Sequence, residues 1–260
     1  MLKNKKILLM IGVLFAMAAG VFAVLSAQTA YIVPILMYHS IDHNDKASKL
    51  SVSPESFERQ MEFLRKNNYN IIPLEDTIAY IRKKERPPQN TIAITLDDGL
   101  ENNYKDAYPA LKKYSIPAAI FVIVNRIGAP GFLSWDEIKE MSDSGIITIG
   151  SHTRTHFWLL GSDPRFLADE VVNSKKILED KLGKKVNIFC YPMGAFDAQS
   201  KKAVEDAGYA CAVGTNPSGT AQDDIFAIKR IKISRSADNI FIFWAETTRL
   251  YTWFKMRRGP

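Results

Sequence analysis

The stretch TIAITLDDG, residues 91–99, decides the fold. Its first six residues are mostly apolar and β-prone, which predicts a buried strand, and Asp97, Asp98 and Gly99 stand at the exit of that strand. Two adjacent carboxylates that lose hydration repel each other, so they need a cation, a metal ion or several backbone N–H groups as partners. Asp-Asp-Gly is also good turn chemistry, and a plain strand-to-loop turn is therefore the structural alternative.

Short apolar segments alternate with amphipathic helical patterns on both sides of this stretch, which is typical of parallel βα units. His39, Asp97, Asp98 and His152 follow three different expected strands, and in a barrel such strand ends meet at one face. We therefore expect one domain built as a distorted (β/α) barrel of about seven or eight parallel strands. Besides 91–96, the main expected strands are 34–38, 118–124, 146–149, 186–190, 209–213 and 227–233, and the main expected helices lie near 75–84, 102–114, 164–182 and 198–207.

The charge of the chain is concentrated at its ends. The net charge is +6 over 260 residues, and the terminal cations Lys3, Lys5, Lys6, Lys255, Arg257 and Arg258 account for all of it. The remaining body has a formal charge of zero, which is not the basic footprint of a nucleic-acid-binding domain. We expect no nucleic-acid partner and a monomeric domain with a substantial apolar core.

Residues 7–27 form an uncharged run directly after the lysine cluster. A helix of that length spans about 30 Å, the thickness of a bilayer core. We expect 1–30 to be an uncleaved signal anchor that holds residues 31–238 on the extracytoplasmic side of the membrane; a cleaved signal peptide is the alternative. Residues 239–260 form an aromatic and basic extension, expected to start as a helix packed on the barrel, with contact to an anionic membrane surface as the alternative.

Cys190 and Cys211 are the only cysteines of the chain, and each lies in a short apolar run. We expect two buried free thiols in neighbouring strands, with a disulfide as the alternative outside the cell. Two cysteines cannot form a zinc finger.

The stretch SHTRTH, residues 151–156, places His152 and His156 four residues apart. On one helical turn their side chains would share a face, which suits two ligands of one ion. With a nearby aspartate they complete a set of two histidines and one carboxylate that leaves positions for water and substrate. We expect a divalent metal, zinc by default, with cobalt or nickel as alternatives. The competing enzyme class is a mononuclear iron oxygenase, but it has no evident need for a second carboxylate beside the ligand.

TLDDG (residues 95–99) and SHTRTH resemble the first two motifs of the polysaccharide deacetylase family, which is carbohydrate esterase family 4 with the nodulation-protein B homology domain. The resemblance extends over roughly residues 33–235. It implies a distorted (β/α) barrel and metal-dependent hydrolysis of acetyl groups on polysaccharides. It also implies that Asp98, His152 and His156 hold the metal and that Asp97 is the general base.

Two departures from the common motifs indicate one branch of that family. Cys190, in FCYPMG at 189–194, stands where typical members have an arginine, and ILMYH at 35–39 resembles the segment that carries their general acid near the C-terminus. This set resembles the poly-N-acetylglucosamine and intercellular-adhesin deacetylases of biofilm systems. We expect His39 to be the acid, because its pKa lies near neutrality.

The missing arginine raises the question of what orients the base. Arg230 ends the last expected strand, and we expect it to pair with Asp97; Arg154 is the competing candidate, but we expect its side chain to point to solvent. The resemblance implies that the backbone N–H of Met193 stabilises the oxyanion.

The expected substrate is an exported or cell-wall polysaccharide that carries N-acetyl groups. Biofilm poly-N-acetylglucosamine, peptidoglycan, chitin-like oligomers and acetylated xylan all stay open. The second function class is a membrane-tethered sugar-binding module with a degenerate site, suggested by the missing arginine. The expected substrate-binding residues are Tyr38, Trp135 and Trp158, for which core packing is the alternative, together with Tyr191 and Pro192.

Overall fold

A parallel sheet forms the core of the computed structural model, which describes residues 2–29, 32–43, 49–215 and 224–257. Eight strands follow one another in the order β8-β7-β6-β5-β4-β3-β1-β9, and β2 pairs with β3 beside this path. Each of these neighbouring pairs is parallel. The strands are β1 (Ile35–Tyr38), β2 (Asn70–Ile71), β3 (Thr91–Leu96), β4 (Ala118–Val122), β5 (Ile147–Ser151), β6 (Ile188–Cys190), β7 (Cys211–Gly214), β8 (Ile228–Lys229) and β9 (Ile231–Lys232).

The last strand segment nearly closes this sheet into a barrel. β8 pairs with β7 at one end of the strand order and β9 pairs with β1 at the other end, and only Arg230 lies between them. The amide of Arg230 donates to the Gly214 carbonyl at 3.2 Å, and the amide of Ile233 donates to the Met37 carbonyl at 3.0 Å. The prediction of a distorted barrel of parallel strands is confirmed, and Arg230 occupies its seam.

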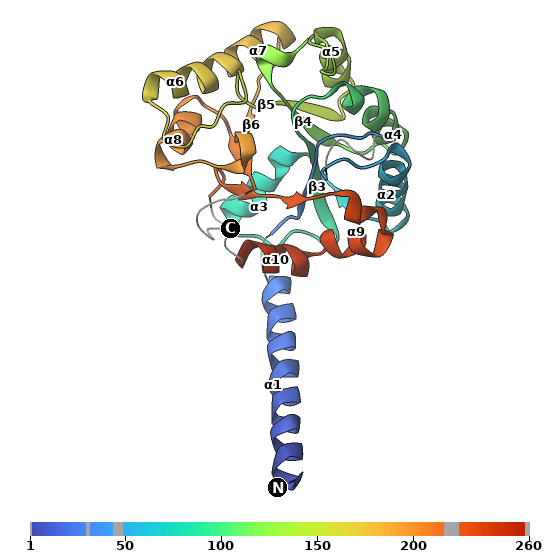
Figure 1. Ribbon diagram of the computed structural model, residues 1–260. Coiled ribbons are helices and arrows are strands. Elements are labelled where there is room, and N and C mark those ends of the chain that lie inside the picture. Colours follow the sequence, from blue (N-terminus) through green and yellow to red (C-terminus); the bar gives the residue numbers. More distant parts are fainter. Residues whose placement is uncertain (1, 30–31, 44–48, 216–223, 258–260) are drawn as a thin grey trace.

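Helices surround the strands (Figure 1). Side-chain caps begin two of them. The Ser53 hydroxyl accepts from the Ser56 amide at 3.2 Å, and Ser134 and Glu137 form a capping box. The helices of the barrel are α2 (Pro54–Lys66), α3 (Thr77–Lys83), α4 (Tyr108–Lys113), α5 (Trp135–Asp143), α6 (Pro164–Ala168), α7 (Ser174–Leu182), α8 (Ala198–Asp206), α9 (Ile240–Glu246) and α10 (Arg249–Arg257).

Two of the predicted helices contain a π-helical turn. Asn103–Ala107 precedes α4, and Asp169–Asn173 joins α6 to α7. A π turn adds a residue to a helix and changes which side chains face inward, and such turns are frequent at functional sites. Here each turn contains a buried polar residue, Asn103 in the first and Glu170 in the second.

The N-terminal helix α1 (Leu2–Thr29) extends away from the barrel, and its C-terminal end lies beside α10 (Figure 1). Ala23, Ile32 and Trp253 form a small apolar cluster there. The predicted helix is present, but none of the helices in the described part of the chain has the length and apolarity needed to cross a membrane, so the predicted anchor is not supported. Residues 1, 30–31 and 258–260, on which parts of that prediction and of the basic extension rest, lie outside the described residues.

The two cysteines are buried free thiols, as predicted. They lie on the neighbouring strands β6 and β7, but Cys190 is paired with Val213 and Cys211 with Ile188. The predicted helical start of the C-terminal extension is also present, since α9 places the buried Phe243 against the core.

Candidate metal and catalytic centre

The Asp-Asp-Gly turn delivers two carboxylates from the end of β3. Asp98 and Gly99 both adopt left-handed backbone, with φ of 72° and 66°. A Cβ at position 99 would lie 2.9 Å from Val122 Cγ1, so the turn requires glycine. Asp97 is buried, whereas the side chain of Asp98 stays 25% exposed at the barrel mouth.

The predicted pairing of Arg230 with Asp97 is present as a buried two-pronged ion pair. Arg230 Nη1 donates to Asp97 Oδ1 at 2.6 Å and Nη2 donates to Oδ2 at 2.7 Å. Burial alone would raise the pKa of Asp97, but the guanidinium outweighs it and holds that pKa well below its ordinary value. The carboxylate is therefore ionised at neutral pH.

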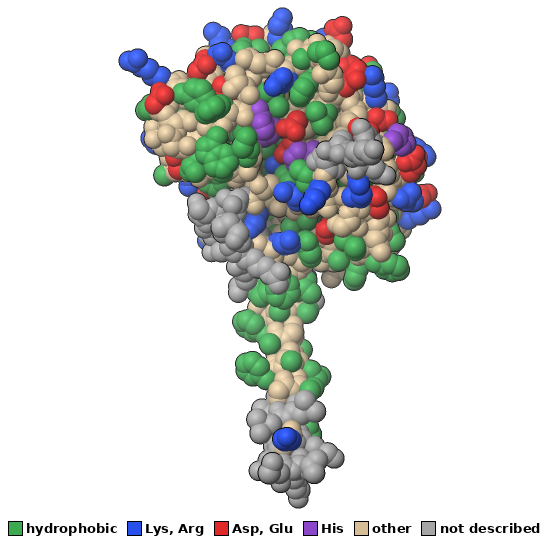
Figure 2. Space-filling model, in the orientation of Figure 1, with side chains coloured by type: hydrophobic (Ala, Val, Ile, Leu, Met, Phe, Trp, Pro, Cys, Tyr) green, Lys and Arg blue, Asp and Glu red, His purple; other side chains and the backbone are tan. Residues whose placement is uncertain are grey.

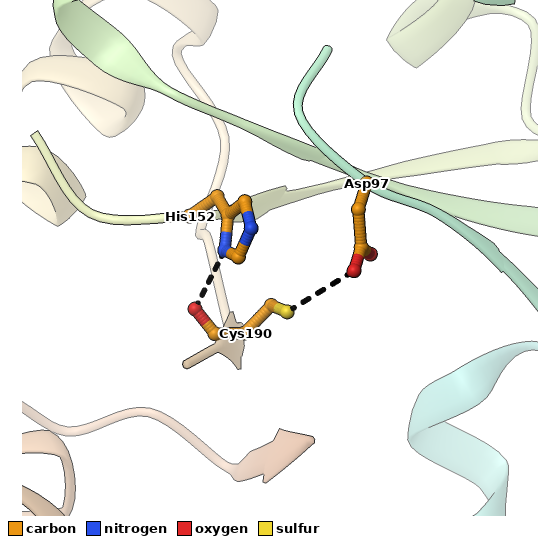
Figure 3. A group of neighbouring side chains, drawn as sticks. All are labelled: Asp97, His152 and Cys190. Carbon is orange, nitrogen blue, oxygen red and sulfur yellow. Dashed lines mark hydrogen bonds between the residues drawn. The ribbon is translucent and has the colours of Figure 1, made fainter. Parts of the chain in front are cut away.

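Cys190 and Thr95 complete the surroundings of this pair. Arg230 Nη1 donates to Thr95 Oγ1 at 3.1 Å, and Nη2 donates to Cys190 Sγ at 3.0 Å. The Cys190 thiol donates to Asp97 Oδ2 at 3.7 Å (Figure 3). Arg154 was the competing candidate, with its side chain expected in solvent. Its side chain is 34% exposed, but Nη1 is held by both oxygens of Asp169 at 2.6 and 2.7 Å.

His152 and His156 come together, but the predicted helical turn between them is wrong. Residues 152–157 form no helix, since Thr153 and His156 have left-handed φ values of 66° and 63°. The amide of His156 donates to Thr153 Oγ1 at 3.0 Å. This turn brings the two imidazole rings to a centroid distance of 4.7 Å, so the ligand pair forms by another backbone path.

Asp98, His152 and His156 fit a divalent metal ion. Asp98 Oδ1 lies 3.5 Å from each histidine Nε2, and the three donor atoms are all within 4.8 Å of one another. His152 Nδ1 lies 2.8 Å from the Cys190 carbonyl (Figure 3). A carbonyl can only accept, so Nδ1–H donates to it and Nε2 is the nitrogen that can bind a metal. Two imidazoles and one carboxylate form a donor set that zinc accepts in catalytic sites.

A second group of potential ligands consists of Asp97, His152 and Cys190 (Figure 3). Cys190 Sγ already accepts from Arg230 Nη2 at 3.0 Å, and burial raises the pKa of the Cys190 thiol. A thiol must lose its proton to bind a metal. The set that includes Asp98 is therefore the better site.

His39 faces the same centre from the end of β1. Its Nε2 lies 3.8 Å from Asp97 Oδ2, and the side chain of Asn103 donates to the His39 carbonyl at 2.8 Å. Burial lowers the pKa of His39, and the negative charges of Asp97 and Asp98 oppose that change only in part. His39 and both aspartates line a cavity of about 240 Å³. Figure 2 shows histidine and acidic side chains gathered in a hollow on this face of the barrel.

The predicted substrate-binding residues lie in different places. Tyr38 is wrong as a sugar platform, because it is fully buried and donates to Gln60 Oε1 at 2.7 Å. Tyr191 lines the cavity, but it is as fully buried as Tyr38 and its hydroxyl donates to the Phe226 carbonyl at 3.0 Å. Pro192 is buried beside it, and Trp158 is 39% exposed two residues beyond His156. Trp135 begins α5, where Lys181 Nζ lies 5.9 Å from its ring centroid, and it is not among the residues that line the cavity.

Met193 also lines the cavity, in a tight turn. Its φ is 56°, and the following Gly194 has a φ of 72°. A Cβ on Gly194 would lie 1.9 Å from Thr215 Oγ1, so the turn depends on this glycine. The role of the Met193 amide stays a prediction.

The sequence profile of the polysaccharide deacetylase family matches residues 84–212, a range that includes the metal-ligand candidates but neither His39 nor Arg230. The Bacillus subtilis protein YxkH, assigned by name to the polysaccharide deacetylases, is 36% identical over 202 residues, which cover 77% of this chain and 71% of that protein. The poly-β-1,6-N-acetyl-D-glucosamine N-deacetylase of Staphylococcus epidermidis is 28% identical over 201 residues, 72% of this chain and 69% of that protein. The structure of IcaB from Ammonifex degensii superposes with a TM-score of 0.73 and 25% identity, over 82% of this chain and 97% of that one.

Proposed function

The chain belongs to the polysaccharide deacetylase family, whose members are hydrolases, and we propose that it removes N-acetyl groups from an N-acetylglucosamine-type polysaccharide with a divalent metal ion. One observation carries this proposal. The ligand set of Asp98, His152 and His156 shares a cavity with a buried, ionised carboxylate, that of Asp97. A metal ion beside a general base is one combination that can hydrolyse an unreactive amide.

Asp98, His152 and His156 would hold the metal, zinc being the simplest choice for these donors and cobalt or nickel the alternatives. Bound there, the ion would polarise the acetyl carbonyl and acidify a water molecule. Asp97 is the general base of the proposal, since the guanidinium of Arg230 keeps it ionised and fixes its orientation. It takes a proton from the attacking water.

The leaving amine needs a proton, and His39 is placed to give it. Its ring lies 3.8 Å from the base, and the Asn103 side chain fixes its backbone carbonyl. The backbone N–H of Met193 stabilises the negative charge that develops on the carbonyl oxygen, with Tyr191 beside it in the cavity.

The substrate part of the proposal rests on likeness to named relatives. The Staphylococcus epidermidis relative is named for poly-β-1,6-N-acetyl-D-glucosamine, which favours a β-1,6-linked polymer and a site of action outside the cytoplasm. The alternative of a degenerate sugar-binding module loses its main support, because Arg230 supplies the guanidinium that the common motif would place at Cys190.

An acetate-release assay tests the proposal. The purified chain with added Zn²⁺ is incubated with oligomers of β-1,6-linked N-acetylglucosamine, chitin oligomers, peptidoglycan and acetylated xylan. We expect the wild-type chain to release acetate from the β-1,6-linked oligomer and the Asp97→Asn variant to release none from the same oligomer. Binding of the oligomer without acetate release would favour the sugar-binding module.

A further inference from the structure

The turn between the two histidine ligands is strained, and its own residues hold it only in part. Thr153 and His156 both have positive φ, and for residues with a Cβ this conformation costs about 1–2 kcal/mol each. Thr153 Oγ1 accepts from the His156 amide, but within the described residues no member of the turn accepts from the amides of residues 154 and 155. The partners of these two amides must come from another element.

Glu170 supplies these partners. Its Oε2 accepts from the Arg154 amide at 2.9 Å and from the Thr155 amide at 2.8 Å, and its Oε1 accepts from the Thr155 hydroxyl at 2.7 Å. One carboxylate therefore makes three hydrogen bonds to two consecutive residues between the ligands. Carboxylate bonds to N–H groups are about twice as strong as bonds between neutral groups.

The helix that carries Glu170 also fixes the strand end on the other side of His152. Ser174, one turn further along, accepts from the Ser151 hydroxyl at 2.8 Å, and that hydroxyl in turn accepts from the Thr153 amide at 3.2 Å. The helix thus contacts the chain directly before the first ligand and directly before the second. The π turn at 169–173 provides the spacing between the two contacts.

The charge of Glu170 is not explained by packing alone. The residue is 1% exposed, and within the described residues no lysine or arginine forms an ion pair with it, since the guanidinium of Arg154 binds Asp169 instead. Burial of a carboxylate is costly unless its surroundings favour the charge. The two backbone N–H groups and the Thr155 hydroxyl supply this compensation, so the buried carboxylate and the histidine turn stabilise each other.

We propose that Glu170 is a positioning residue of the metal centre, which holds the turn from His152 to His156 in the conformation that binds the ion. The proposal rests on the proposed function, because it concerns the same centre. Residues that orient metal ligands through hydrogen bonds typically contribute about 10–100-fold to metal affinity or activity. Glu170→Ala should weaken Zn²⁺ and Co²⁺ binding by a factor in this range.

The test measures Co²⁺ binding to the metal-stripped full chain, both by titration and by the visible absorption that reports the geometry of the ligands. Glu170→Gln keeps an oxygen that accepts from both amides, and its Nε2 can donate to the Thr155 hydroxyl, so it should lose less affinity than Glu170→Ala. Thr155→Val removes only the hydroxyl bond and should have a small effect in the same direction. This milder variant keeps the test valid if Glu170→Ala does not fold.

Two controls separate positioning from general stability. Asp169→Asn breaks the neighbouring ion pair with Arg154 but leaves the backbone amide bonds to Glu170. Glu179→Gln alters a helix carboxylate away from the centre, which accepts from the Val186 amide at 3.0 Å. Both should bind Co²⁺ like the wild type. Unchanged Co²⁺ affinity and absorption in the Glu170 and Thr155 variants would overturn the proposal, and so would equal losses in the controls. A wild-type chain that binds no Co²⁺ would instead overturn the proposed function, and the inference with it.

Discussion

Arg230→Ala is the perturbation that probes the buried ion pair most sharply. The side chains of Arg230 and Asp97 are 1% and 4% exposed, and the guanidinium makes both of the short bonds to the carboxylate. Removing one partner of a buried pair leaves an uncompensated charge and costs about 3–5 kcal/mol. Among the described residues, the other side chains near this carboxylate are more distant, with Cys190 Sγ at 3.7 Å and His39 Nε2 at 3.8 Å from Asp97 Oδ2.

The loss should depend on pH in a defined direction. In the wild type the pKa of Asp97 is depressed, so its ionised form stabilises the fold above the unfolded pKa of about 3.9. Without Arg230, burial raises that pKa above the unfolded value, and the folded state is penalised until a proton binds. The difference in unfolding free energy between wild type and variant should therefore be larger at pH 8 than at pH 5.

Urea unfolding of the metal-stripped chain at these two pH values measures the effect. Arg230→Ala combined with Asp97→Asn should be at least about 1 kcal/mol more stable than the sum of the single losses predicts, because the double variant leaves no unpaired charge. Acetate release by Arg230→Ala should fall by about 10²-fold, as expected when the orientation of the base is lost. Additive single effects, or a destabilisation that does not change with pH, would refute this reasoning.

Three further predictions follow from individual residues. His39 acts in its protonated form, so turnover should fall as pH rises through its pKa, which burial places below the ordinary value of about 6.5. His39→Ala should lower turnover about 10²-fold and remove this decline. If the variant keeps the decline, another group causes it. Burial raises the pKa of Glu246 to about 7, above the unfolded value of about 4.3, so stability falls as pH rises between these values. Glu246→Gln should therefore have a higher melting temperature than wild type at pH 8 and the same one at pH 4, and equal shifts at both would contradict the assignment. Gly194→Ala should reduce acetate release by about tenfold or more because its Cβ meets Thr215, whereas Gly208→Ala, which also has positive φ but open space around it, should affect stability alone.

The barrel could be predicted because its evidence is local. A short apolar run predicts a strand, and a polar residue that follows the run is expected at the end of the barrel where the carboxyl ends of the strands meet. The pairing of Arg230 with Asp97, 133 positions apart in the sequence, could be predicted in this way, because Asp97 follows one strand and Arg230 interrupts another strand of the same nearly closed sheet.

The failures have equally local causes. Thr153 and His156 carry no signal for left-handed backbone, so their spacing suggested a helix that does not form. Tyr38 was predicted on the wrong face, because side chains alternate along a strand and Tyr38 points to the helices while its neighbour His39 faces the cavity. Asn103 and Glu170 were missed because both lie in π turns, which shift a helix out of the regular period that a sequence pattern can detect.

The central claim is that the centre formed by Asp98, His152 and His156 removes acetyl groups with a bound metal ion. The most direct test is acetate release from a β-1,6-linked N-acetylglucosamine oligomer by the same preparation before chelation, after chelation and after addition of Zn²⁺. The expected result is activity that is lost on chelation and restored by Zn²⁺, and that cannot be restored in Asp98→Asn. Full acetate release by exhaustively demetallated protein would contradict the account.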